Sequence, residues 1–180
     1  KIAVFNDGIF KLTYNILNDL GIDINNVNSS DFKLYGNGGK ALPTLNSIYR
    51  PDDLIQNAVY VEDGLDGSFD RNDYVLFYGQ GPHETYYDHN TDAFRHQINI
   101  YSDTNYYFLR VNYQEGLRLQ TNIAGDIESD TIINSYNAFQ YHEQDLTNVL
   151  TSGREWYGEG FDFSSSFNKT FDLTDYLPES

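Results

Sequence analysis

EDGLDGSFDRNDYVLFYGQGPHE, residues 62–84, is the stretch that decides the fold. Its middle, residues 74–78, is a run of aliphatic and aromatic residues that is typical of a β-strand. Because the run does not alternate between apolar and polar residues, it predicts a strand that is buried on both faces within a sheet. Glycine and proline in residues 79–82 then predict a turn that ends the strand.

The acidic loop before this strand has two interpretations. Carboxylates on a turn that glycine allows to fold sharply are typical calcium ligands, and Gly67 matches the invariant glycine of an EF-hand loop. The match is incomplete, because Gly64 falls where that loop needs a ligand. Alternatively, the aspartates hold the loop through Asx turns. The candidate calcium ligands are Glu62, Asp63, Asp66, Asp70 and Asp73, and no other cofactor is indicated.

The composition is that of an acidic, folded chain. With 180 residues, 39% of them hydrophobic, it is long enough to bury a substantial core. The net charge of −16 argues against nucleic-acid binding, because phosphate contacts require a basic surface. It also disfavours docking on an anionic membrane. No apolar run is long enough to span a bilayer, so we expect no direct membrane insertion.

Cysteine is absent from the sequence, which excludes disulfides, cysteine-bound metals and a cysteine nucleophile. No serine–histidine–aspartate set is recognisable from spacing either, so we expect that this chain is not itself an enzyme. The chain opens with Lys1 in the middle of a strand pattern and ends without a closing element. We therefore expect a segment of a longer protein, with any signal peptide outside it.

Short strands with turn signals about every ten residues predict a mainly β fold, specifically an antiparallel β-sandwich-like domain with one or two short helices. We expect residues 1–180 to form this single domain, with a sub-boundary near residues 122–135. Asp-Gly at Asp7 and Gly8 predicts a hairpin over residues 1–13, and a second hairpin is expected over residues 97–111. The expected strands are residues 1–5, 9–13, 32–35, 58–62, 74–78, 97–102, 106–111, 117–121 and 167–173, and the expected helices are residues 14–20 and 142–150.

Two further groups contain residue types that often bind metals or phosphate in other proteins. His83, Glu84, His89 and His96 could supply zinc ligands, but their spacing does not place two imidazoles on one helix face. We therefore expect surface histidines in a loop. The glycine-rich residues 36–39 lack the following helix of a phosphate-binding loop, so they predict a tight turn with positive φ.

The segment of residues 153–159 contains Trp156, the single tryptophan, between Glu155 and Glu159. A carboxylate pair beside an aromatic ring suggests sugar chemistry. In an extended segment the two carboxylates would lie ~13 Å apart, which is too far for glycoside hydrolysis. We instead expect structural packing of Trp156, with Arg154 paired to a carboxylate.

Five collinear blocks cover nearly the whole chain: DGIFKLTYNILNDLGID (residues 7–23), FKLYGNGGKALP (32–43), DDLIQNAVYVEDGLDGSFDRNDYVLFYGQGPHE (52–84), INIYSDTNYYFL (98–109) and SGREWYGEGFD (152–162). Together they resemble the N-terminal region of PorU-type proteins. These are the sortases of the bacterial type IX secretion system, which are related to gingipains and grouped with the C25 cysteine peptidases. The resemblance implies a large outer-membrane-associated protein that removes the sorting signal of secreted cargo and joins the new carboxyl end to an anionic lipopolysaccharide.

In that family the catalytic histidine and cysteine lie in a later, gingipain-like domain, so the resemblance assigns no catalytic residue to this chain. It implies a non-catalytic accessory domain at the cell surface, on the extracellular side of the outer membrane. The implied partners are the downstream peptidase domain, an outer-membrane barrel or the sorting domain of cargo. The alternatives are a carbohydrate-binding β-sandwich module, suggested by the tyrosine-rich composition and the acidic loop, and, as a third class, a glycoside hydrolase domain.

Overall fold

A computed structural model describes residues 1–24, 27–120, 138–151, 153, 155–161 and 166–172. The chain divides into two compact units. Unit 1 comprises residues 1–85 and 97–123, and unit 2 comprises residues 86–96 and 124–180. The predicted sub-boundary near residues 122–135 lies outside the described residues, so it stays a prediction, as does the single domain.

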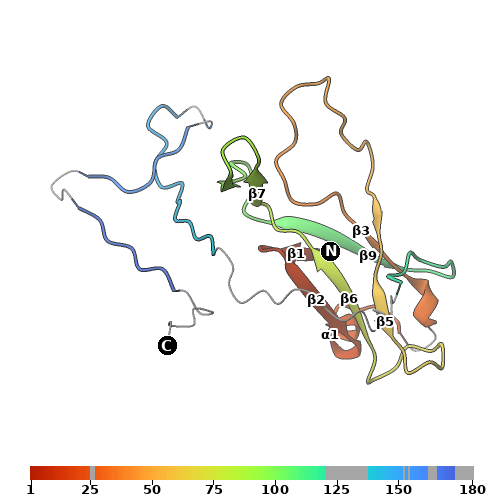
Figure 1. The fold of residues 1–180 in the computed structure, drawn as a ribbon. Helices are drawn as coiled ribbons and strands as arrows, with labels where there is room; N and C mark the ends of the chain where they lie inside the picture. The colour runs from red at the N-terminus through yellow and green to blue at the C-terminus, as the bar shows by residue number, and fades with distance from the viewer. Residues whose placement is uncertain (25–26, 121–137, 152, 154, 162–165, 173–180) are drawn as a thin grey trace, which may run out of the picture. The chain divides into compact units, whose positions relative to one another are not determined.

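The first sheet of unit 1 is antiparallel and has β9 near its centre (Figure 1). On one side of β9, Ala3 lies opposite Tyr106, and on the other side Leu34 lies opposite Leu109. Alternate side chains of a strand point to opposite faces, and Tyr107 is accordingly buried next to the half-exposed Tyr106. In order across the sheet, the strands are β1 (Ile2–Val4), β9 (Asn105–Val111), β3 (Phe32–Tyr35) and β4 (Gln56–Asn57).

The second sheet of unit 1 consists of β2 (Gly8–Thr13), β6 (Tyr74–Gly79) and β5 (Tyr60–Glu62), with β6 in the centre (Figure 1). The predicted central strand is therefore confirmed. The prediction that it is buried on both faces is wrong, because Val75 and Phe77 are buried whereas Tyr78 on the opposite face is 54% exposed. The large aromatic side chains of the run made a half-exposed strand resemble a fully buried one.

The two sheets contribute to one core, which confirms the mainly β fold. Leu12, Val75 and Phe77 of the second sheet belong to the same cluster of buried side chains as Phe32 and Tyr107 of the first. The rings of Phe77 and Tyr107 lie 5.5 Å apart, and each fully buried apolar side chain of this size contributes about 1.5–3 kcal/mol to the free energy of unfolding.

A single α-helix, α1 (Tyr14–Asp19), is found among the described residues, and it confirms the first predicted helix. Thr13 caps it, because its hydroxyl accepts a hydrogen bond from the N–H of Ile16 at 3.4 Å. Leu17 is fully buried on the core side, and Gly21 follows the helix with a φ of +79°. A one-turn 3-10 helix, η1 (Ser29–Asp31), leads into β3. Within the described residues, no helix has the length and apolar character needed to cross a membrane.

The hairpin predicted over residues 1–13 is wrong, because β1 and β2 belong to different sheets. A tight two-residue hairpin needs positive φ at its centre, and neither Asp7 nor Gly8 has it. The Asp7 carboxylate instead accepts a hydrogen bond from the N–H of Gly81 at 2.7 Å. A contact 74 residues away in the sequence therefore decides the local turn.

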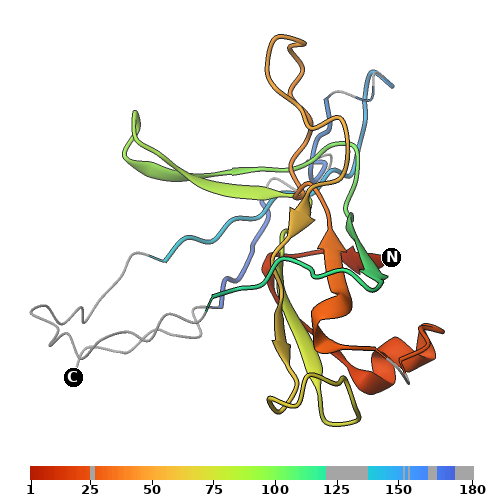
Figure 2. The ribbon, with the colours of Figure 1, turned by 90° about the vertical axis from the view of Figure 1, so that its right-hand side faces the viewer.

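The hairpin predicted over residues 97–111 is also wrong. The hairpin in this region is formed by β7 (Glu84–Asp88) and β8 (Ala93–Gln97), a twisted two-stranded ribbon in Figure 2. Asn99 prevents a strand over residues 97–102, because its side-chain oxygen accepts a hydrogen bond from the N–H of Tyr101 at 3.0 Å and forms a turn.

Residues 117–121 were expected to form a strand, but in the described part Arg118 forms one parallel bridge with Val59. The guanidinium group of Arg118 donates hydrogen bonds to the carbonyl oxygens of Phe32 at 2.9 Å and Ser29 at 2.7 Å. Burial lowers the pKa of Arg118 below its usual value, and nearby carboxylates oppose that shift. This side chain therefore ties the segment to β3 in place of strand pairing.

The described part of unit 2 contains much less regular structure than unit 1. The predicted helix over residues 142–150 is wrong, because Thr147 forms an antiparallel bridge with Tyr157. The apolar side chains expected on one helix face, such as Leu150, are exposed, and a short helix forms only when such a face is buried. The predicted strand of residues 167–173 is absent from its described part, residues 167–172.

Candidate functional site

The acidic loop connects β5 to β6, and two of its aspartates bind the loop's own backbone. The Asp63 carboxylate accepts a hydrogen bond from the N–H of Leu65 at 3.0 Å, and the Asp66 carboxylate accepts one from the N–H of Ser68 at 2.8 Å. A hydrogen bond from the Ser29 side chain is the largest cause that lowers the pKa of Asp63 below 3.8. Both aspartates form the Asx turns that were the structural alternative to an ion site.

The other candidate ligands also have partners within the chain. The Asp73 carboxylate accepts a hydrogen bond from the N–H of Asp70 at 2.6 Å, and the Glu62 carboxylate accepts one from the hydroxyl of Tyr60. Across the described residues, no three histidine, aspartate or glutamate side chains gather in a way that could hold a metal ion. Calcium binding by these residues stays a hypothesis.

The predicted group of histidines divides between different environments. His83 accepts a hydrogen bond from the N–H of Asn99 at 3.1 Å, and so holds the segment that follows β8. His96 lies on β8 with only 6% of its side chain exposed, so the prediction of a surface histidine is wrong there. Its ring stacks on Tyr141 at 3.5 Å, and a ring nitrogen lies 3.1 Å from the Glu143 carboxylate.

The segment around the tryptophan is held by a histidine–glutamate contact in unit 2. Glu159 pairs with His142, and this hydrogen bond is the largest cause that lowers the pKa of Glu159 below 4.5. Trp156 is 40% exposed, so it is only partly packed, and Arg154 lies outside the described residues. The predicted pairing of Arg154 with a carboxylate stays a prediction.

Two glycine-rich loops of unit 1 cross with their backbones in close contact. We call this crossing the loop junction and define it as residues 36–41, 79–84 and 97–99. At Gly39 an added Cβ would lie 1.3 Å from the carbonyl oxygen of Gly81, and at Gly36 it would lie 2.5 Å from the ring of Tyr107. Gly38 has the predicted positive φ, at +82°, but residues 36–39 form no hydrogen-bonded turn. The glycines are therefore required for close backbone approach.

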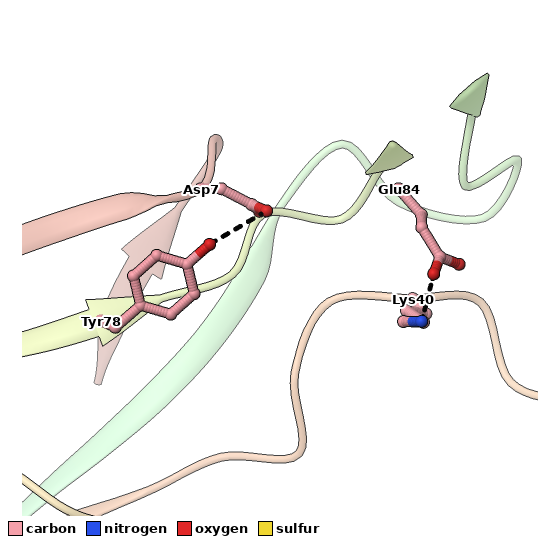
Figure 3. Close-up of polar contacts among 4 residues, drawn as sticks. All are labelled: Asp7, Lys40, Tyr78 and Glu84. Carbon is pink, nitrogen blue, oxygen red and sulfur yellow. Dashed lines mark hydrogen bonds and ion pairs between the residues drawn. The ribbon is translucent and has the colours of Figure 1, made fainter. Parts of the chain in front are cut away.

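Hydrogen bonds fix the second of these loops to both sheets. The N–H of Gly81 donates to the Asp7 carboxylate, and the N–H of Gln80 donates to the hydroxyl of the buried Tyr107 at 2.9 Å. The Tyr78 hydroxyl points toward the same carboxylate at 3.4 Å (Figure 3). The negative charge of Asp7 is the largest cause that raises the pKa of Tyr78 above 10.0.

A small pocket of about 60 Å³ lies at the loop junction. Lys40 and Glu84 form an ion pair beside it (Figure 3), and Gln97 and Asn99 add polar groups to its lining. Pockets that bind drug-sized ligands have volumes of roughly 300–1,000 Å³, so this one is too small for a substrate of that size. These residues can hold the loops in place. Among the described residues of the pocket, no nucleophile is paired with a base.

Sequence analysis did not identify the loop junction, although one signal was present. The chain has two glycine-rich turns, GNGG at residues 36–39 and GQGP at residues 79–82. A turn of this kind often needs one glycine for positive φ, and the additional glycines indicate close approach of another backbone. The roles of Asp7 and Tyr107 had no local signal, because their partners are distant in the sequence.

The chain is similar to the solved structure of dimeric latent PorU from Porphyromonas gingivalis. The two share 26% sequence identity at a TM-score of 0.52, over 73% of this chain. The chain spans only 11% of the length of that protein. No protein-family model matches the chain, and no curated protein does. The similarity in both structure and sequence supports a relation to PorU and agrees with the β-rich fold.

Proposed function

We propose that this chain is a non-catalytic accessory domain of a PorU-like C25 cysteine peptidase, a sortase of the type IX secretion system at the cell surface. Its role is to support the peptidase domain of the parent protein and to dock a partner. The observation that carries the proposal is the similarity to PorU, which extends over 73% of this chain but only 11% of PorU. A segment of that size fits one domain of a much larger protein.

The chemistry of the chain supports the non-catalytic part of the proposal. A cysteine peptidase needs a thiolate nucleophile, and the sequence contains no cysteine. At the loop junction, the side chains of Asp7 and Tyr107 accept hydrogen bonds from backbone N–H groups and so have a structural role. Catalysis in the parent protein would accordingly depend on a histidine and a cysteine outside this chain.

Exposed apolar side chains support the docking part of the proposal. The described part of unit 2 exposes aliphatic and aromatic side chains, and large exposed apolar surfaces commonly mark interaction sites. The candidate partners are the downstream peptidase domain, an outer-membrane barrel and the sorting domain of cargo. The exposed side chains are Tyr86, Tyr87, Phe94, Phe139, Tyr141, Leu146, Val149, Leu150, Trp156, Tyr157, Phe161, Phe167 and Phe171.

Complementation in trans tests the proposal. A parent protein that lacks residues 1–180 but keeps its catalytic residues should process cargo poorly, and purified chain added separately should restore processing. The purified chain alone should not cleave a sorting-signal peptide. Cleavage by the chain alone would contradict the non-catalytic role, and full processing without the chain would contradict the accessory role. A glycan array addresses the carbohydrate-binding alternative, for which no described feature offers comparable support.

A further inference from the structure

Strand β2 has one edge without a strand partner. It is the outermost strand of the sheet β2-β6-β5, and β6 is its single neighbour among the described strands. The pairing with β6 is continuous over all six residues, from Gly8 opposite Gly79 to Thr13 opposite Tyr74. In an antiparallel pair, alternate residues direct their N–H and C=O groups away from the partner strand. Within the described part of the chain, the outer edge of β2 therefore presents a row of backbone donors and acceptors that no other strand pairs.

Among the described residues, the one usual protective device on β2 is an exposed lysine, and it reaches toward β6 and away from the edge. Natural edge strands are short, or they carry proline, a bulge or an exposed lysine. β2 has six residues, no proline and no bulge in its pairing with β6. Its lysine, Lys11, lies over the ring of Tyr74 on β6 at 3.7 Å, on the side away from the edge. Ile9 next to the edge is 76% exposed.

We propose that the outer edge of β2 accepts an extended strand of a partner protein, a neutral to basic segment with apolar residues at alternate positions. This inference rests on the proposed docking role and names the surface that performs it. An added strand would pair its backbone with the free groups of β2, which is a recurrent mode of peptide recognition.

The side chains beside the edge account for the apolar pattern of the proposed partner. On the exposed face of the sheet, Ile9 lies opposite Tyr78, and both side chains are largely exposed. On the core face, Phe10 stacks on Phe77 with a ring separation of 5.4 Å. Because directly opposite residues share a face, apolar residues at alternate positions of a strand added beside β2 would extend one of these two rows.

Charge accounts for the neutral to basic character. The exposed Asp7 immediately precedes β2, and the exposed Asp19 ends the helix that follows it. The whole chain has a net charge of −16, so an acidic strand or a second copy of this chain would be repelled. The acidic charge of the chain therefore favours a strand that carries basic residues.

The test uses the purified chain and a blocked seven-residue peptide of alternating valine and threonine between terminal lysines. Two control peptides replace the lysines with glutamates or the central residue with proline. We expect the lysine peptide at millimolar concentration to slow hydrogen exchange of the outward-facing amides of residues 8–13 by about tenfold or more. The glutamate and proline peptides should protect them much less.

A matched pair of variants assigns the binding to this edge. Ile9→Lys and Leu65→Lys add the same charge at exposed positions, where the wild-type side chains are 76% and 98% exposed. We expect Ile9→Lys to weaken peptide binding by about tenfold, because a lysine beside the edge is the usual protection against strand addition. Leu65→Lys should bind like the wild type.

Three results would overturn the proposal: no protection of residues 8–13, equal binding by both variants, or equal binding of the glutamate peptide. Protection that appears without peptide and rises with chain concentration would assign the edge to a second copy instead. The complementation experiment separates this inference from the proposed function. An Ile9→Lys chain that restores processing rejects this edge alone, whereas a wild-type chain that fails to restore it rejects the accessory role.

Discussion

At the scale of single residues, Gly39 and Gly81 mark the point where two backbone segments of the loop junction approach each other closely. Alanine at position 39 would place its Cβ 1.3 Å from the Gly81 carbonyl oxygen, a backbone atom that cannot move without displacing the loop. We expect Gly39→Ala to lower the free energy of unfolding by more than about 2 kcal/mol. Gly8→Ala is the control, since an added Cβ there meets no atom within 4 Å. Equal melting temperatures for the two variants would contradict the loop crossing.

Because of two tyrosine–carboxylate pairs, we expect the free energy of unfolding to depend on pH in alkaline solution. The charge of Asp7 raises the pKa of Tyr78 above 10.0, and a hydrogen bond to Asp92 does the same for Tyr87. A phenol that binds its proton more tightly in the folded chain contributes stability below its unfolded pKa, and this contribution is lost as the pH rises through the folded pKa. We therefore expect the free energy of unfolding, measured by denaturant titration, to decrease above pH ~10.

Asp92→Asn isolates one of these pairs. It removes the carboxylate that accepts the hydrogen bond from Tyr87, so the pKa of Tyr87 should move back toward 10.0. A carbon-13 NMR titration of the tyrosine rings measures this change directly. An unchanged Tyr87 titration in the variant would show that the pair does not form in solution.

At the scale of a single element, β6 buries one face and exposes the other. Val75 is fully buried, so Val75→Asp should lower the free energy of unfolding by several kcal/mol through an unpaired buried charge. Leu76, on the opposite face, is partly exposed, and we expect Leu76→Asp to cost about 1 kcal/mol. Both variants lose a similar β propensity, so the difference reports burial. Equal destabilisation in thermal melts would mean that both faces are covered in solution.

The acidic loop provides a test of the cation hypothesis at the same scale. Because its aspartates already accept backbone hydrogen bonds, we expect calcium at ~2 mM to leave the melting temperature unchanged relative to chelator. An ion bound with a dissociation constant of ~10⁻⁴ M would instead add about 1.8 kcal/mol, or roughly 4–7 °C. Such a rise, abolished in Asp70→Asn, would establish a calcium site in this loop.

At the scale of the whole molecule, the core belongs to unit 1. Every member of the buried hydrophobic cluster, from Val4 to Tyr107, lies in unit 1. The described part of unit 2 contains most of the β7–β8 hairpin, aromatic contacts and a short bridge between Thr147 and Tyr157. We expect the amides of this bridge to exchange with deuterium roughly a hundredfold faster than those of β6. Equal protection would show that both units unfold as one cooperative structure.

Local sequence patterns predicted the elements that depend on local physics. Thr13 and Gly21 defined the ends of α1, because a capping hydroxyl and a glycine in the left-handed region act within one helical turn. The central strand and the Asx turns of the acidic loop were recognisable for the same reason. The helix expected over residues 142–150 does not form, because a short helix needs a surface on which to bury side chains such as Leu150. No local sequence pattern reveals whether such a surface exists.

The sequence by itself determined that the fold is mainly β, that the chain has no thiol chemistry and that its blocks resemble PorU-type proteins. These conclusions depend on residue identity, spacing and order alone. Only the tertiary structure shows that β1 and β2 enter different sheets and that Asp7 holds Gly81. It also shows that β6 is buried on one face and that β2 is an edge strand among the described strands. The physical reason is that burial and strand pairing depend on partners distant in the chain, such as Asp7 and Gly81, 74 residues apart.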